Sequence, residues 1–124
     1  VGKLDPIAKS LTEEHGAKLV YTISTNEADL VTATSRVDLI INSTSLGLKE
    51  NDALPLPAAS LSAKHMVYDA VYNPPVTPLL AEANKLGAKT SNGLSMLLHQ
   101  GAISFAFWLG QEPSIAAMRR GLGK

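Results

Sequence analysis

The spacing of hydrophobic and polar residues changes along the chain, and each kind of spacing predicts a kind of element. Apolar residues recur at helical intervals in five stretches, which predicts helices over residues 5–15, 26–34, 78–85, 93–109 and 112–121. Short β-branched and aromatic runs predict strands over residues 18–23, 37–42, 65–68 and 88–90. The run at 37–42 (VDLIIN) is typical of a strand buried on both faces.

Strands that alternate with helices through short turns indicate an α/β fold with a parallel sheet of βαβ units. By its length, the chain is expected to form one domain over residues 1–124. Ligands of such sheets bind beyond the carboxyl ends of the strands. The loops that follow Asn42 and Tyr68 are therefore the places where a site is expected.

Composition narrows the classes of function. Hydrophobic residues make up 45% of the chain and charged residues 18%, which favours a folded domain over disorder. The formal net charge is zero, so no basic field points to nucleic acid. The sequence has no cysteine and its three histidines are scattered, so no metal site is expected. With no secretory signal and no apolar segment long enough for a bilayer, a cytoplasmic protein that does not bind membranes is expected.

Four consecutive hydroxyl or amide side chains, Asn42 to Ser45, follow the predicted strand at 37–42. At the carboxyl edge of a sheet they could bind a ribose, an amide or a phosphate. Alternatively, they form a turn on their own, because Asn, Ser and Thr favour turns. The position directly after a strand favours the ligand-binding interpretation.

The segment from Asp69 to Pro78 holds three prolines, which stiffen it and could fix Tyr72 for a hydrogen bond to a hydroxylated ligand. Tyr72 could instead be a half-buried packing residue. For Thr77 we expect a capping role at the helix that begins with Pro78, and for Asp69 a role in holding the following turn together rather than as a base.

The helix predicted at 93–109 carries a narrow stripe of small or polar positions on an otherwise apolar surface, formed by Gly93, Met96, Gln100 and Ser104. Gly93 permits close approach to the first turn, whose N–H groups lack helical partners. The stripe therefore either faces a ligand or is the solvent face of an amphipathic helix.

Four stretches of the sequence resemble the C-terminal half of shikimate dehydrogenases, in the same order. They are Asp38–Gly47 (DLIINSTSLG), Tyr68–Pro74 (YDAVYNP), Thr77–Leu80 (TPLL) and Gly93–Gly101 (GLSMLLHQG). The resemblance implies NADPH-dependent reduction of 3-dehydroshikimate to shikimate, with NADP as cofactor. It also implies a Rossmann-like, doubly wound parallel sheet followed by C-terminal helices.

The resemblance also implies two sets of binding residues. Tyr72 and Gln100 would contact the substrate. The residues implied to contact the cofactor are Lys3, Ser43, Thr44, Ser45, Ala70, Gly93 and Met96. Lys3 lies where the family has an Asn-Arg-Thr motif that holds the 2′-phosphate, and a lysine would meet that phosphate without the bidentate fork of arginine.

Two features of the family are not found in the sequence. The glycine-rich dinucleotide fingerprint is absent, and so is the substrate domain that carries the Lys/Asp pair for proton transfer. We therefore expect a partial sheet without its first βα unit, no catalytic residue in this chain and an inactive isolated chain. Unpaired strand edges predict a homo-oligomer or a need for the missing N-terminal domain.

Two other interpretations stay open from the residues alone. One is a non-catalytic nucleotide-binding or interaction module. The other is a quinate or aminoshikimate dehydrogenase relative, because most of the residues that discriminate these substrates lie outside this sequence. The preference for NADP over NAD is equally undecided by these residues.

Overall fold

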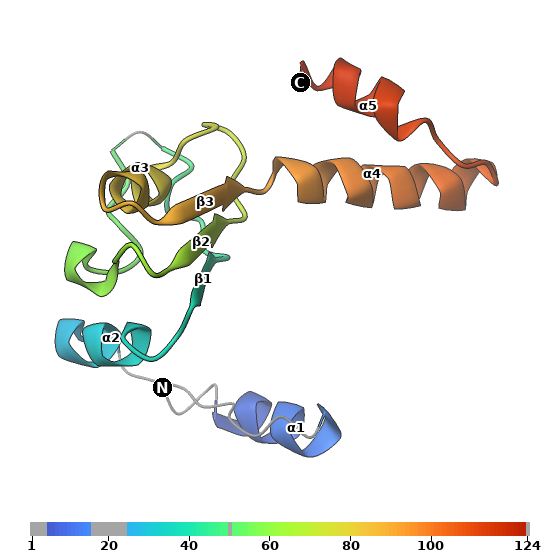
Figure 1. Ribbon diagram of the computed structural model, residues 1–124. Coiled ribbons are helices and arrows are strands. Elements are labelled where there is room, and N and C mark those ends of the chain that lie inside the picture. The colour runs from blue at the N-terminus through green and yellow to red at the C-terminus, as the bar shows by residue number, and fades with distance from the viewer. Residues whose placement is uncertain (1–4, 16–24, 50, 124) are drawn as a thin grey trace.

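The computed structural model describes residues 5–15, 25–49 and 51–123, in which helices and strands alternate along most of the chain (Figure 1). In chain order, its elements are α1 (Asp5–His15), α2 (Glu27–Thr34), β1 (Leu39–Asn42), the 3₁₀ helix η1 (Ala58–Ser60), β2 (Met66–Asp69), α3 (Pro78–Lys85), β3 (Lys89–Asn92), α4 (Leu94–Leu109) and α5 (Ile115–Gly121). The strand predicted at 18–23 and the cofactor residue Lys3 lie outside the described residues.

The three described strands form one parallel sheet in the order β1-β2-β3. The register aligns Asn42 with Asp69 and Asp69 with Asn92, so the strands end on one line. This confirms the α/β fold with a parallel sheet. The bounds of α1 and α3 are those predicted, and the ends of the other described strands and helices differ from the predicted ones by at most three residues.

Local sequence signals explain where the helices begin and end. Thr77 caps α3, accepting a hydrogen bond from the N–H of Leu80, and Pro78 occupies the first helical position. Gly110 ends α4 with a φ of 62°, in the left-handed region that favours glycine. The prediction for α5 was wrong by three residues, because Ser114 caps this helix and Pro113 precedes the cap.

The hydrophobic core lies between the sheet and α3. Its most buried members are Val67 of β2 and Leu79 and Ala83 of α3, with exposed fractions of 0%, 1% and 0%. The remaining buried members are Leu61, Leu80 and Ala88. Helix α3 connects β2 to β3, and its apolar face packs against these two strands.

One expectation about β1 is wrong for the part of the chain that the structure describes. Leu39 and Ile41 keep 49% and 58% of their surfaces exposed, although a strand buried on both faces was predicted. Ile40 alone packs against the core, and β2 is the single described neighbour of β1. The apolar composition of β1 is that of an interior strand, whereas its position is that of an edge strand.

A buried histidine joins α2 to the segment that leads into β2. His65 is 3% exposed; its Nδ1 accepts from the backbone N–H of Ser62 at 3.1 Å, and its Nε2 lies 3.0 Å from the carbonyl oxygen of Thr34. These partners set the tautomer, because a carbonyl only accepts and an amide only donates. Nε2 therefore carries the proton.

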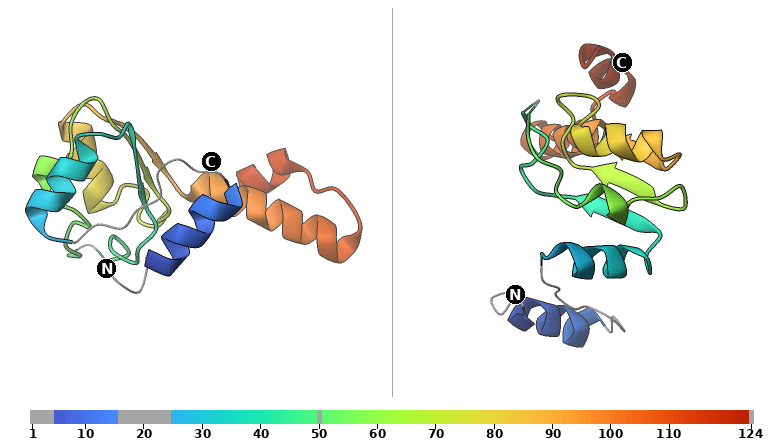
Figure 2. Two further views of the ribbon diagram at one scale, coloured as in Figure 1. Left: turned by 90° about the horizontal axis from the view of Figure 1, so that it is seen from below. Right: turned by 90° about the vertical axis from the view of Figure 1, so that its left-hand side faces the viewer.

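Helix α4 extends away from the sheet, and α5 turns back beside it (Figures 1 and 2). Leu98 and Ala102 form the buried side of α4, whereas Phe107 and Trp108 near its end are 84% and 77% exposed. Among the described residues, none of the helices combines the length and the apolar character that crossing a bilayer would require.

Candidate functional site

The three strands end with the same local device. The side-chain oxygens of Asn42, Asp69 and Asn92 each accept a hydrogen bond from the backbone N–H two residues further on, at 3.0, 3.0 and 3.1 Å. This is the Asx turn, in which a side chain stands in for a backbone acceptor. Because the three residues are aligned in the sheet, the chain makes three sharp turns side by side at the carboxyl ends of the strands.

Asp69 lies at the centre of this edge and is fully buried, with an exposed fraction of 0%. Its Oδ1 accepts from Asn42 Nδ2 at 3.0 Å, and its Oδ2 accepts from Thr77 Oγ1 at 2.6 Å. The expectation that Asp69 holds the following turn together is confirmed, as is the capping role of Thr77. Asp69 thereby links the loop after β1, the loop after β2 and the start of α3.

The loop after β1 is ordered by its own hydrogen bonds. Thr44 Oγ1 donates to Asn42 Oδ1 at 2.7 Å and accepts from the backbone N–H of Leu46 at 3.1 Å. The turn-forming interpretation of this cluster is therefore confirmed, and it is compatible with ligand binding, because Thr44 also lines a hollow at the surface. Ser43 and Ser45 lie on either side of Thr44 and are exposed.

A single carboxylate closes the far end of the same loop. Asp52 Oδ2 accepts from the backbone N–H groups of Lys49 and Gly47, at 3.0 Å each. These bonds, with that from Lys49 first, lower the pKa of Asp52 below its ordinary value of 3.8. A carboxylate that accepts backbone N–H bonds is favoured in its charged form.

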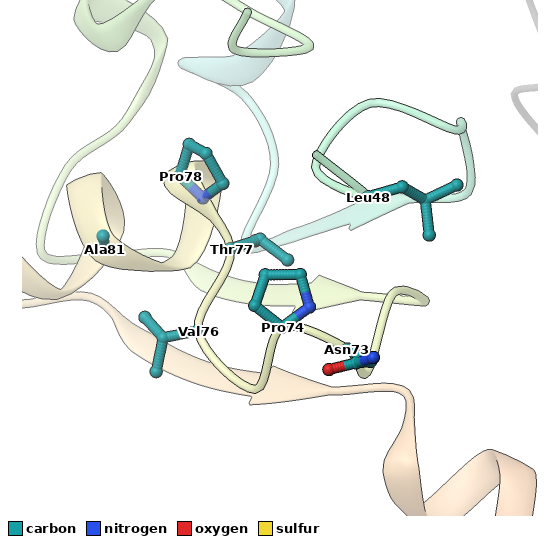
Figure 3. Close-up of a pocket in the computed structure, with 7 residues that line it drawn as sticks. All are labelled: Leu48, Asn73, Pro74, Val76, Thr77, Pro78 and Ala81. Atoms are coloured by element: carbon teal, nitrogen blue, oxygen red, sulfur yellow. The ribbon is translucent and has the colours of Figure 1, made fainter. Parts of the chain in front are cut away.

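Two adjoining hollows lie between the loop after β1 and the loop after β2. The smaller, of about 370 Å³, is lined by Thr44, Leu48 and the segment 70–73. The larger, of about 530 Å³, shares Leu48 and Asn73 and continues along α3 (Figure 3). We take the smaller one as the candidate site, because three of the predicted contact residues, Thr44, Ala70 and Tyr72, line it together.

Figure 3 shows the larger hollow, which shares Leu48 and Asn73 with the candidate site. Leu48 and Asn73 lie at one side of it, and Val76 and Ala81 lie at the other, with Pro74 between them. Leu48 and Asn73 are not among the residues that the sequence predicts for the site. An apolar residue and a proline-flanked Asn carry no local signal of a site, and the fold alone brings them beside Thr44.

Gly93 lies against the loop after β2. A Cβ atom at this position would lie 2.0 Å from the carbonyl oxygen of Ala70 and 2.7 Å from its carbonyl carbon. The backbone N–H of Gly93 donates to the carbonyl of Val71 at 3.3 Å. The predicted close approach at Gly93 is therefore present, and it brings the start of α4 against the residues that line the candidate site.

The remaining predicted residues lie on α4, away from the hollow. Met96 is 46% exposed, and Gln100 is exposed one turn further along the helix. Ser104 of the same stripe is half-buried and Gly93 is buried. Apolar residues of α4 such as Ile103 and Phe107 are more exposed than Met96, so the role of the stripe stays a prediction. Of the predicted contact residues, the structure thus brings Thr44, Ala70 and Tyr72 together, and their roles toward a ligand stay predictions.

Comparison with known proteins finds shikimate dehydrogenases that are similar to nearly the whole chain. A family model described as Shikimate 5'-dehydrogenase C-terminal domain matches residues 93–120. The shikimate dehydrogenase (NADP(+)) of Methanocaldococcus jannaschii is 39% identical over 124 residues, which cover 98% of this chain and 43% of that protein. The chain therefore spans less than half the length of this relative.

Solved structures extend the likeness to three dimensions. A crystal structure of shikimate dehydrogenase in complex with NADP+ has a TM-score of 0.80 and 40% sequence identity, covering 97% of this chain and 42% of the other. Quinate dehydrogenase from Corynebacterium glutamicum in complex with NAD has a TM-score of 0.78 and 27% identity, covering 93% and 40%. Sequence and fold agree along almost the entire chain, which therefore belongs to the shikimate dehydrogenase family.

Proposed function

We propose that residues 1–124 form the C-terminal part of the dinucleotide-binding domain of an NADP-dependent oxidoreductase that interconverts 3-dehydroshikimate and shikimate. The observation that carries this proposal is the hollow at the carboxyl edge of the sheet, in a chain whose relatives include a shikimate dehydrogenase solved with NADP+. A non-catalytic module is not favoured, because the relatives described above are dehydrogenases.

The residues around the hollow fit the nicotinamide end of such a cofactor. Thr44 offers a hydroxyl and Ala70 its backbone, and none of the lining residues bears a carboxylate that would repel a phosphate. Gly93 lies behind Ala70 and adds a surface without a side chain. When bound, NADPH supplies the hydride for reduction of the ketone. The part of this chain is to hold and orient the ring, with Ser43, Ser45, Met96 and Lys3 as further cofactor contacts.

Tyr72 and Gln100 are the proposed substrate contacts. The Tyr72 side chain is 41% exposed at the mouth of the hollow, where its phenol can meet a hydroxyl group of the substrate. We assign no proton-transferring group to this chain. The isolated chain is therefore expected to bind without turning over shikimate and NADP+.

An NMR titration tests the cofactor assignment. NADP+ added to the ¹⁵N-labelled chain should shift the backbone signals of Thr44, Ala70 and Gly93, and Thr44→Val should weaken binding. Thr32→Val is the matched control, because the Thr32 hydroxyl is also exposed but bonds within α2. Unchanged signals at these three residues with saturating NADP+ would refute the cofactor assignment, and measurable turnover would refute the expected inactivity.

A quinate dehydrogenase is the second candidate, because the solved quinate dehydrogenase shares the fold at a TM-score of 0.78. That structure contains NAD, but a shikimate dehydrogenase has also been solved with shikimate and NAD, so the cofactor does not separate the two candidates. Titrating the chain with NADP+ and NAD+ in parallel therefore measures its cofactor preference. Tighter binding of NAD+ would contradict the assignment of NADP.

We further propose that the chain self-associates in the cytoplasm. Leu39, Ile41 and Met66 leave an apolar patch exposed on one face of the sheet at its β1 edge. Gel filtration with light scattering should give a mass above 13.1 kDa, and Ile41→Lys should lower it. Lys89→Glu, a charge change on β3, serves as control, and a monomeric wild type would contradict the proposal.

A further inference from the structure

The direction of each hydrogen bond at the carboxyl edge of the sheet is determined by a buried carboxylate. Asp69 receives three donors, from Asn42 Nδ2, the backbone N–H of Val71 and the hydroxyl of Thr77. The Thr77 hydroxyl donates here, because a carboxylate oxygen only accepts, and it accepts in turn from the backbone N–H of Leu80. Asp69 thus acts only as an acceptor toward Asn42.

The orientation of the Asn42 amide follows from its neighbours. On one side lie two acceptors, Asp69 Oδ1 and the carbonyl oxygen of Leu46, each at 3.0 Å. On the other side lies the backbone N–H of Thr44, which can only donate. The amide nitrogen must therefore face Asp69 and Leu46, and the amide oxygen must face Thr44. Asn42 is 3% exposed, so water does not compete for these groups.

The oxygen of Asn42 in turn fixes the hydroxyl of Thr44. Thr44 Oγ1 lies 2.7 Å from Asn42 Oδ1, which has no proton to give, so the Thr44 proton lies between these two oxygens. The backbone N–H of Leu46 uses one lone pair of Oγ1. A hydroxyl oxygen has two lone pairs, so one is left for a ligand and no proton is left.

We propose that Asn42 and Asp69 are positioning residues that make Thr44 an acceptor toward the hollow, so that the site selects a ligand group that donates a hydrogen bond. This rests on the proposed function, in which the ligand is a nicotinamide dinucleotide. At its nicotinamide end two kinds of group qualify as donors: the carboxamide N–H₂ and the hydroxyls of the nicotinamide ribose. A carbonyl or phosphate oxygen presented to Thr44 would find no proton there.

Analogues of the cofactor test the polarity of Thr44 and distinguish the two donors. Dissociation constants are measured by NMR for NADP+, for its 3-acetylpyridine analogue, in which a methyl group replaces the amide N–H₂, and for the analogue with a deoxygenated nicotinamide ribose. One of the two analogues should bind about threefold to tenfold more weakly than NADP+, the usual worth of one hydrogen bond. The analogue that is weakened identifies the donor.

Variants link the effect to the chain of hydrogen bonds. The penalty for the weakened analogue should persist in Thr44→Ser, which keeps the hydroxyl, and disappear in Thr44→Val. It should also shrink in Asn42→Ala, where the Thr44 hydroxyl is free to rotate and donate. Should Asn42→Ala not fold, the Thr44 pair decides alone. Equal binding of NADP+ and both analogues at the hollow would overturn the proposal.

A measurement without ligand tests the positioning itself. Both side-chain N–H₂ protons of Asn42 should exchange with D₂O at least tenfold more slowly than those of the exposed Asn51, because both are bonded and buried. Equal exchange would refute the orientation of Asn42 and hence the acceptor role. Slow exchange together with no NADP+ shifts at the hollow would instead refute the proposed function and leave the hydrogen-bond chain supported.

Discussion

Replacing Gly93 by alanine should destabilise the chain more than any other glycine substitution that leaves φ unstrained. The backbone of Gly93 has a φ of −74° and a ψ of 1°, which alanine adopts without penalty, so the cost is steric alone. The new Cβ would lie 2.0 Å from Ala70 O, whereas real Cβ atoms do not come within 3.0 Å of such an atom. One of two backbone segments must therefore move by at least an ångström.

The expected size of the loss follows from what has to move. Overpacking costs about 1–3 kcal/mol, and more where backbone rather than a side chain must yield. Both obstructing atoms here belong to the Ala70 backbone, next to the fully buried Asp69. We therefore expect a loss of about 3 kcal/mol. For a chain of this length, that corresponds to a fall in Tm of roughly 12 °C.

Two other glycines provide matched controls. At Gly121 and Gly110 an added Cβ meets nothing within 4 Å, but Gly110 has a φ of 62° whereas that of Gly121 is ordinary. Gly121→Ala should therefore be neutral or slightly stabilising, and Gly110→Ala should cost about 1 kcal/mol for its left-handed backbone. Urea unfolding followed by circular dichroism measures all three, since Trp108, at 77% exposure, is a poor fluorescence reporter. A Gly93→Ala chain as stable as Gly110→Ala would refute the steric argument.

Three further substitutions test single contacts. The pKa of Asp52 is lowered in the folded chain, first by the backbone N–H of Lys49. The charged carboxylate therefore stabilises the fold above the unfolded-state pKa, and this stabilisation is lost as the pH falls through the folded-state pKa. Asp52→Asn should lower the free energy of unfolding at pH 7 and weaken its dependence on pH below about pH 4. His65→Phe leaves the backbone N–H of Ser62 without its acceptor and removes one of the two donors to the Thr34 carbonyl, so it should cost about 2 kcal/mol by urea unfolding, more than His65→Gln. Thr77→Val removes both a helix cap and a donor to a buried carboxylate, so it should cost about 2 kcal/mol in the same assay, whereas Thr77→Ser should cost under 1; equal losses would contradict the hydrogen-bond account.

Elements punctuated by local signals were predictable from the sequence. Helix α3 has the predicted bounds 78–85, which follow from Pro78 and the glycine after the helix. Helix α4 begins one residue after the predicted start at Gly93 and ends, as predicted, before Gly110. The predicted start of α5 at residue 112 is too early, because Pro113 precedes the cap Ser114 instead of lying in the first turn. Cap geometry decides such boundaries, and adjacent Pro and Ser residues offer two solutions.

Burial was less predictable than secondary structure. The apolar run of β1 indicates that its residues suit a buried strand, but it does not show which elements would cover them. Among the described residues nothing covers Ile41, which is 58% exposed. Phe107 and Trp108 at the end of α4 are likewise apolar residues that no described element covers. For the site, the sequence placed Thr44 and Tyr72 at one sheet edge but could not show that Leu48 and Asn73 would join them.

The bond between Asn42 and Asp69 shows why one polar pair can matter both to the fold and to the site. The Asx turns at the ends of β1 and β2 are local and would form in any register, but the Asn42–Asp69 bond spans 27 residues and requires these two strand ends to be aligned. A slip of one residue between β1 and β2 would place Asn42 opposite Tyr68 or Ala70 and leave a buried amide and a buried carboxylate without each other. The cost of burying these groups therefore selects the register, and that register places Thr44 and Tyr72 around the same hollow.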